Sequence, residues 1–220
     1  MAKLLYLVHR MPYPPNKGDK VRSYHLLKHL AARHQVFLGT FVDDPDDWQH
    51  LPVLRGLCAD VCAVPLAPRI AKLRSLVGLV TGEALSLRYY RHATLQAWVA
   101  HTLSVQQVDA AVVFSSSMAP YALAQPGLPV LADLVDVDSA KWTEYADRHA
   151  WPMSWLYRRE GARLLDYERR VVARARRSFL VTEKEVALFG RLAPESRGQV
   201  LAVGNGVDAE YFQPDAARTS

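Results

Sequence analysis

Three carboxylates stand close together in the sequence at the end of an apolar run that predicts a buried strand. They are Asp133, Asp136 and Asp138, and Lys141 follows them. Carboxylates beside a lysine could accept hydrogen bonds from sugar hydroxyls, and they could also bind a metal ion. Asp138 or Ser139 could instead cap the helix that follows, but capping accounts for only one of the three acids. We therefore favour a functional site here, with Asp136 and Asp138 as the candidate catalytic residues.

A second polar loop, at residues 9–22, follows the first apolar run of the chain. Its Gly18 precedes a predicted helix and is flanked by Lys17, Lys20 and Arg22. A glycine lets a backbone N–H group approach an anion, and the N-terminus of a helix favours negative charge. The loop has neither the three glycines of a dinucleotide-binding turn nor the Gly-Lys-Ser/Thr of a Walker loop. A connection stiffened by prolines, with solvated lysines, is an equally good interpretation.

The positive charge of the chain is concentrated in one predicted helix at residues 155–175. Residues 158–177 contain eight arginines and three acids, an excess equal to the net charge of +5 for the whole chain. At about 100° per residue, one face of this region carries Arg159, Arg163, Arg170, Arg174 and Arg177. This face could attract anionic lipid or a phosphate-bearing acceptor, or it could be an ordinary solvated surface. Glu168 lies on the apolar side, so we expect a backbone N–H group at a helix end or in a loop as its partner.

Two further features receive structural interpretations. The basic and apolar segment 69–80 could lie on a membrane surface, but it is short and we favour a packed core helix. Cys58 and Cys62 lack the further ligands that zinc requires, so we interpret them as reduced core thiols. Nucleic-acid binding is disfavoured, because the arginines have little aromatic interleaving and no helix-turn-helix, KH or RRM motif is present.

The composition is that of a globular protein, with half of the residues apolar and 22% charged. No apolar run reaches the roughly 18 residues that span a bilayer. The N-terminus lacks the long apolar region and the small-residue cleavage site of a secretory signal. We therefore expect a cytoplasmic protein.

Apolar runs and helical patterns alternate along the chain. The runs predict strands at 3–8, 35–41, 60–64, 109–114, 129–134, 178–181 and 199–203. Helices are expected at 21–33, 68–80, 95–107, 139–149, 155–175 and 183–191. A further helix is expected after a capping segment at 43–46 and should reach about residue 57. Strands without polar alternation, joined by helices, predict an α/β fold with a doubly wound parallel sheet covered on both faces. Ligands of such sheets bind beyond the carboxyl ends of the strands, where both polar loops lie.

Several segments resemble a known enzyme family. The stretch Val203-Gly204-Asn205-Gly206-Val207-Asp208, followed by Tyr211-Phe212-Gln213-Pro214, is similar to the interdomain hinge of the retaining family 4 glycosyltransferases, which have the GT-B fold. Tyr167-Glu168-Arg169-Arg170 and Val181-Thr182-Glu183 resemble the helix glutamate and the Ser/Thr-Glu of that family. The loops at 12–20 and 135–142 look most like the sugar transferases associated with the exosortase/PEP-CTERM systems of bacterial exopolysaccharide production.

The resemblance implies two Rossmann-like domains across a cleft, with a nucleotide diphosphate sugar held mainly by the second domain. Residues 1–203 would form the acceptor-side domain and residues 204–220 the hinge. The donor domain would be missing, so we expect this chain to be an inactive part of a longer enzyme. That enzyme would transfer a sugar, without metal or cofactor, to a glycan or lipid-linked acceptor beside the inner membrane surface. A non-enzymatic module that binds an anionic membrane or polymer is the alternative.

The resemblance also assigns roles by position. Gly18, Asp19 and Lys20 would lie near the donor diphosphate, and Asp136 and Asp138 would line the cleft beside the acceptor. The acceptor side and the cleft edge would comprise His9, Arg22, Ser115, Ser116, Lys141, Thr182 and Glu183, with Asn205 and Gly206 at the hinge. The chain departs from the family in two places. It has one glycine after the first strand where a pair is frequent, and Asp136-Val137-Asp138 where many relatives carry a histidine.

Overall fold

The computed structural model describes residues 1–206. Within them, seven parallel strands form a sheet in the order β3-β2-β1-β4-β5-β6-β7. The strands are β1 (Lys3–Val8), β2 (Gln35–Val42), β3 (Asp60–Pro65), β4 (Ala110–Phe114), β5 (Val130–Val135), β6 (Arg177–Leu180) and β7 (Val200–Ala202). Helical segments join consecutive strands, so the predicted α/β fold with a parallel sheet is confirmed.

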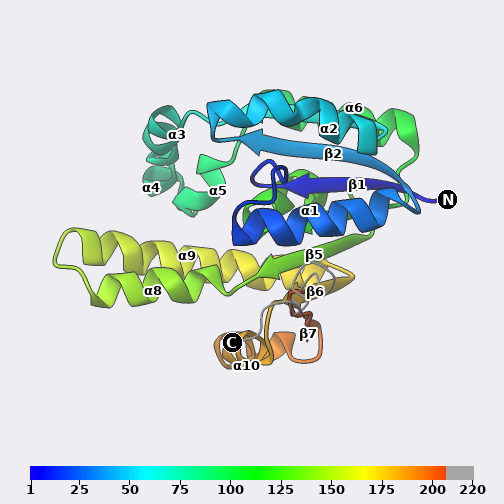
Figure 1. Cartoon of the computed structure of the whole chain (residues 1–220). Helices are drawn as coiled ribbons and strands as arrows, with labels where there is room; N and C mark the ends of the chain where they lie inside the picture. The colour runs from blue at the N-terminus through cyan, green and yellow to red at the C-terminus, as the bar shows by residue number, and fades with distance from the viewer. Residues whose placement is uncertain (207–220) are drawn as a thin grey trace, which may run out of the picture.

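Helices cover both faces of the sheet (Figure 1). On one face lie α1 (Gly18–Ala31) and α2 (Leu51–Leu57), and on the other lie α6 (Ala93–Gln106), α7 (Ala119–Leu123), α9 (Met153–Arg174) and α10 (Glu183–Leu192). Helix α8 (Asp138–Asp147) runs alongside α9 (Figure 1). The short helices α3 (Pro68–Ser75), α4 (Val77–Thr81) and α5 (Leu85–Tyr89) follow β3. Three 3-10 helices are η1 (Pro45–His50), η2 (Ser116–Met118) and η3 (Pro194–Ser196).

The strands are continuous apolar runs because each contributes to a core on both faces of the sheet. Along β1, Leu5 and Leu7 face one core, whereas Tyr6 and Val8 face the other. The Tyr6 side chain is fully buried, and its hydroxyl donates a 3.1 Å hydrogen bond to the Ser23 carbonyl in α1. Two-sided burial therefore fixes the position of β1, and with it the start of the polar loop that follows.

Most predicted elements are present, with ends shifted by one to three residues. Helix α1 begins at Gly18 rather than at residue 21, so Gly18 belongs to its first turn. The predicted helix at 68–80 is two helices that meet at Leu76, and the five-residue helices α5 and α7 were not predicted. Helices of this length contain little more than one turn, which is too short to show helical periodicity.

The segment 69–80 is not a core helix, so that interpretation is wrong. Its large side chains are exposed, whereas the small residues Ala71, Ser75 and Gly78 face the protein. Among residues 1–206, no helix is long and apolar enough to cross a bilayer.

Candidate functional site

The loop after β1 forms an ion-pair cluster around Asp19. The Asp19 carboxylate accepts a 2.8 Å hydrogen bond from Arg10 Nη1 and lies 3.6 Å from His9 Nε2. Arg10 Nε also pairs with Asp43 at 2.8 Å. The nearby His9 ring, together with the charge of Arg10, holds the pKa of Asp19 well below its ordinary value, although burial acts in the opposite direction. Asp19 is therefore a fixed anion that orients the His9 ring.

His9 is held in a defined position at the end of β1. Its ring stacks parallel to Phe114, with centroids 5.9 Å apart, and meets Tyr90 edge-on at 5.7 Å. Because Nε2 faces Asp19, the second ring nitrogen, Nδ1, points elsewhere. It is buried and has no hydrogen-bond partner among the described residues. A buried polar atom without a partner is costly, so Nδ1 is a natural position for a ligand hydroxyl to satisfy.

The residues predicted to hold a diphosphate separate into two groups. Gly18 is the first residue of α1, which starts without a side-chain cap, and a Cβ atom at Gly18 would meet nothing within 4 Å. The space beside Gly18 in this first turn is therefore open. Lys20 is only 2% exposed, and its Nζ lies 2.5 Å from Asp47 Oδ2. The predicted phosphate contact of Lys20 is wrong, because its ammonium group is buried and already paired.

The loop after β5 brings two carboxylates and one ammonium group together. Lys141 Nζ lies 2.7 Å from Asp136 Oδ2 and 3.4 Å from Asp138 Oδ1. Burial raises the pKa of Asp138, and the charge of Lys141 only partly offsets this. Burial lowers the pKa of Lys141, but its two carboxylate partners raise it more. The charge of His9 also acts to lower the pKa of Asp138, so the loops after β1 and β5 are electrostatically coupled at this edge of the sheet, and we refer to His9, Asp136, Asp138 and Lys141 as the polar cluster.

Helix α8 is capped by glutamates from other helices and not by its own first residues. Glu168 accepts hydrogen bonds from the Ser139 N–H group at 3.2 Å and from Ser139 Oγ at 2.5 Å. Glu185 accepts a 2.7 Å hydrogen bond from the N–H group of Val137. The expected backbone partner of Glu168 is confirmed, and the capping alternative for Asp138 and Ser139 is wrong because neither side chain caps the helix.

The role of Glu185 was missed in the sequence. Its only signal there is its position three residues after Thr182, the pattern of a capping box. Thr182 does cap α10, since its Oγ1 accepts a 3.1 Å hydrogen bond from the Glu185 N–H group. The Glu185 carboxylate instead reaches 48 residues back along the chain to Val137.

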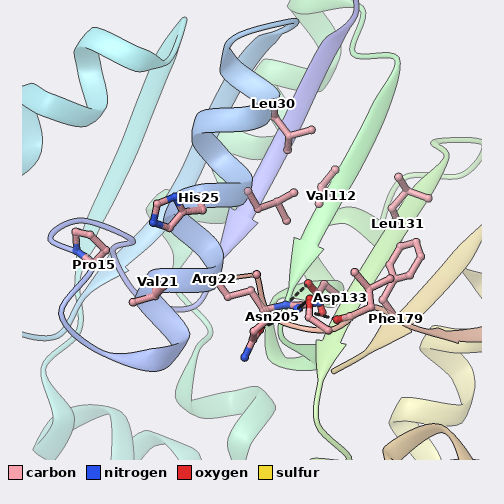
Figure 2. Close-up of a pocket in the computed structure, with 14 residues that line it drawn as sticks. Pro15, Val21, Arg22, His25, Leu30, Val112, Leu131, Asp133, Phe179 and Asn205 are labelled. Atoms are coloured by element: carbon pink, nitrogen blue, oxygen red, sulfur yellow. Dashed lines mark hydrogen bonds and ion pairs between the residues drawn. The ribbon is translucent and has the colours of Figure 1, made fainter. Parts of the chain in front are cut away.

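Arg22 ties α1 to β5 and to the segment after β7 (Figure 2). Its Nε donates a 2.9 Å hydrogen bond to Asp133 Oδ2, and its Nη1 donates to the Val203 carbonyl at 2.8 Å and to Asn205 Oδ1 at 3.0 Å. Burial raises the pKa of Asp133, and the hydrogen bond from Arg22 opposes that rise. The Arg22 guanidinium group is thus used in hydrogen bonds within the protein. Arg22 is a structural tie at the start of the predicted hinge and not an open acceptor contact.

A cavity of about 970 Å³ lies between α1 and the sheet. Its walls include Val112, Leu131 and Phe179 from β4, β5 and β6, with the Arg22–Asp133 pair on one side (Figure 2). The polar cluster of His9, Asp136 and Asp138 does not line it. The cavity is lined mostly by apolar side chains, and its Arg22 and Asp133 groups are paired with each other, so we place the candidate site at the polar cluster.

The remaining predicted residues differ in how accessible they are. Ser115, with φ of 76°, places its Oγ 2.9 Å from Ser117 Oγ, and Ser116 is buried. Glu183 is exposed in the first turn of α10. Gly206 is exposed at the end of the described residues, and the part of the hinge motif from Val207 onward lies outside them.

The arginine face of α9 is largely engaged by the protein. Arg159 donates to the carbonyls of Gly78 at 2.5 Å and Glu83 at 3.3 Å, and Arg174 donates to the Leu123 carbonyl at 2.8 Å. The Arg170 guanidinium lies 5.6 Å from the centroid of the Tyr167 ring. Arg163 is exposed and has no ion-pair partner within residues 1–206. The membrane role of this face stays a prediction, and the contacts of Arg159 and Arg174 do not favour it.

Metal ligands and reactive thiols do not gather at the site. Within the described part of the chain, no three His, Cys, Asp or Glu side chains are placed to hold a metal ion. Cys58 and Cys62 are free, and burial raises the pKa of their thiols to about 12 and about 11. Both are therefore protonated thiols at neutral pH, as the sequence indicated.

Comparison with known proteins identifies the fold. No family model matches the chain, and no curated protein matches it. Among solved structures, it is similar to the sucrose-phosphate synthase of Thermosynechococcus elongatus, with a TM-score of 0.62 and 16% identity over 98% of this chain and 51% of that one. It is also similar to TcCGT1 in complex with UDP (TM-score 0.52, 16% identity, 92% of this chain and 50% of that one). A third similar structure is Arabidopsis thaliana UGT89C1 complexed with UDP (TM-score 0.50, 14% identity, 96% of this chain and 50% of that one).

The chain thus spans about half the length of each solved structure that it matches. These proteins are glycosyltransferases of the GT-B fold, and at such low identity the likeness is one of fold. The described residues have the Rossmann-like α/β fold found in one half of a GT-B glycosyltransferase.

Proposed function

We propose that the protein containing this chain transfers a sugar from a nucleotide diphosphate sugar to a glycan or lipid-linked acceptor. The observation that carries the proposal is the polar cluster of His9, Asp136, Asp138 and Lys141 at the carboxyl edge of the sheet. The three similar structures are glycosyltransferases, and two of them are described as complexes with UDP. A site at this edge, on this fold, favours sugar transfer over a purely structural role.

In this proposal the polar cluster binds the acceptor. Asp136 and Asp138 accept hydrogen bonds from sugar hydroxyls, and Lys141 holds the two carboxylates in place. In the transfer step, the bond from the anomeric carbon to the diphosphate breaks and a bond to the acceptor oxygen forms. The hydroxyl proton leaves to the departing diphosphate.

The donor diphosphate is proposed to lie at the open N-terminus of α1, beside Gly18. The first turn of an uncapped helix presents N–H groups to an anion, and the empty space at Gly18 permits close approach. The rest of the donor would be held by a second domain in the longer protein. We further propose retention of anomeric configuration, independence of metal, and a role in bacterial exopolysaccharide synthesis. These details rest on the hinge and loop sequences that resemble family 4.

The proposal is tested with the longer protein that contains this chain. It is incubated with UDP-glucose, GDP-mannose or ADP-glucose, with and without a polyprenyl-phosphate-linked sugar, and released nucleoside diphosphate is measured. We expect release from one donor that depends on the acceptor and is unchanged by EDTA, with the product anomer matching the donor by NMR. A folded protein that turns over none of these donors, or a gene that ends at Ser220, would contradict the proposal.

A further inference from the structure

Helices α3 and α4 turn their large apolar side chains away from the protein. Ile70, Leu73 and Val80 are 61%, 70% and 90% exposed. Leu76 and Val77 are also exposed, so the aliphatic residues form one continuous outward stripe over both helices. Folded proteins seldom expose an apolar stripe of this kind without a partner for it.

The inward face of the same helices shows that this orientation is fixed. Ala71, Ser75 and Gly78 recur at intervals of four and three residues, and all are buried. A Cβ atom at Gly78 would lie 3.0 Å from the Glu83 carbonyl oxygen, so a larger residue would not fit there. Arg159 of α9 also donates a 2.5 Å hydrogen bond to the Gly78 carbonyl. The helices therefore cannot rotate to bury the aliphatic stripe without breaking these contacts.

The charge around the stripe is of one sign. Between Leu66 and Gly82 there are three basic residues and no acid. Arg69 and Lys72 are exposed beside the apolar side chains, and neither has an ion-pair partner among the described residues. Arg74 donates to the Arg91 carbonyl. The nearest acid, Glu83, is paired with Arg88 and Arg91. The stripe thus presents aliphatic groups and free positive charge together.

Two exposed tryptophans lie at the start of α9 and just before it. Trp151 and Trp155, at the connection between α8 and α9, are 81% and 54% exposed. Trp155 is one helical turn from Arg159, which contacts α4. Figure 1 shows α3, α4 and the α8–α9 connection at the end of the molecule toward which β1, β2 and β5 point. Tryptophan is enriched at the interface between membrane and water.

We propose that α3, α4 and the α8–α9 connection form a membrane-docking surface for a bilayer that contains anionic phospholipid. The aliphatic stripe of α3 and α4 enters the headgroup boundary, and Arg69 and Lys72 contact lipid phosphates. Trp151 and Trp155 anchor the α8–α9 connection at the same boundary. The segment from Leu66 to Gly82 has basic groups and no acid, which favours an anionic lipid surface over a protein surface of mixed charge. This surface goes beyond the proposed sugar transfer, because it involves neither donor nor polar cluster.

Vesicle flotation tests the proposal. The 220-residue chain and the longer protein are each mixed with vesicles of phosphatidylcholine alone or of phosphatidylcholine and phosphatidylglycerol in a three-to-one ratio. We expect binding to the mixed vesicles that weakens as salt is raised. Ile70→Ser with Leu73→Ser should abolish binding, and Arg69→Gln with Lys72→Gln should weaken it about tenfold or more. All four side chains are exposed, so the melting temperature should stay unchanged.

The matched control is Val105→Ser, which alters an exposed valine at the end of α6, before β4 begins. It should bind vesicles like the wild type. The proposal is overturned if the wild type binds neither kind of vesicle. It is likewise overturned if both double variants of α3 bind vesicles as the wild type does. It is also overturned if sedimentation shows a dimer that Ile70→Ser with Leu73→Ser dissociates while vesicle binding is absent. No sugar donor is present, so failure here leaves the transferase proposal untouched.

Discussion

At the scale of single residues, the charged groups near the candidate site divide into those that hold the protein together and those left for a ligand. Lys20 and Arg22 belong to the first kind, since their cationic groups meet Asp47 and Asp133. Asp136, Asp138 and Lys141 are partly exposed, and among residues 1–206 the ion pairs of their side chains are with one another. The distinction depends on burial, and it decides which substitutions should lower stability and which should lower turnover.

The Lys20–Asp47 pair gives the first prediction. Lys20→Met leaves the Asp47 carboxylate buried without its partner, so we expect the free energy of unfolding to fall by about 3 kcal/mol. Lys20→Met combined with Asp47→Leu should recover much of that loss, because no charge remains buried. Urea denaturation of the two variants and of Lys28→Met, at an exposed position on the same helix, provides the comparison. An unchanged free energy of unfolding in Lys20→Met would contradict the structural role of this ion pair and leave Lys20 as a candidate phosphate contact.

Glu168 gives the second prediction, which concerns pH. Burial raises its pKa from the ordinary 4.5 to about 8, so the folded protein binds this proton more tightly than the unfolded chain does. Stability from this group is therefore fully present below about pH 4.5 and is lost as pH rises toward 8. Glu168→Gln keeps the hydrogen bond from the Ser139 N–H group without a titrating group, so its unfolding free energy should decline less over that range. The exposed Glu144→Gln is the control, and equal pH slopes for wild type and Glu168→Gln would contradict the assignment.

At the scale of elements, Arg22 links α1, β5 and the segment after β7 through a single guanidinium group. Arg22→Lys cannot reproduce this set of hydrogen bonds, because lysine lacks the planar fork. We expect faster amide hydrogen exchange at Val203, whose N–H group bonds to the Leu180 carbonyl, and a stability loss of about 2 kcal/mol. His25→Ala, at an exposed position on the same helix, should leave exchange at Val203 unchanged. If Arg22→Lys also leaves it unchanged, the segment is held by other contacts.

The elements also show how far the sequence predicts this structure. The strands and the parallel sheet were predictable because two-sided burial leaves continuous apolar runs. The partner of Glu168 was predictable because a carboxylate on an apolar helix face must find a donor. The burial of Lys20 was not, since Asp47 lies 27 residues away and nothing local marks the pair. The contacts of Arg22 were hidden for the same reason, as they reach residues 111 and 181 positions distant.

At the scale of the whole molecule, the parallel sheet gathers its functional features on one side. The polar cluster follows β1 and β5, and the membrane-docking surface lies at the end of the molecule toward which those strands point (Figure 1). A lipid-linked acceptor needs both features near each other, because its sugar must reach the cluster while its lipid stays in the bilayer. The sequence predicted the cluster from residue types, but the outward apolar stripe depends on which helix face is packed, and periodicity alone does not settle that.

The most direct test of the account is the turnover of Asp136→Asn in the longer protein. Asp136 is partly exposed, and within the described part of the chain its side chain has an ion pair only with Lys141, so its replacement should leave the melting temperature unchanged. Turnover at a low acceptor concentration should fall by about tenfold to a hundredfold, the loss expected when a hydrogen bond from an acceptor hydroxyl to a charged carboxylate is removed. Glu144→Gln, at an exposed acid on α8, the helix that follows this loop, should turn over at the wild-type rate. A wild-type rate in Asp136→Asn, or a large drop in its melting temperature, would contradict the placement of the transfer site at this cluster.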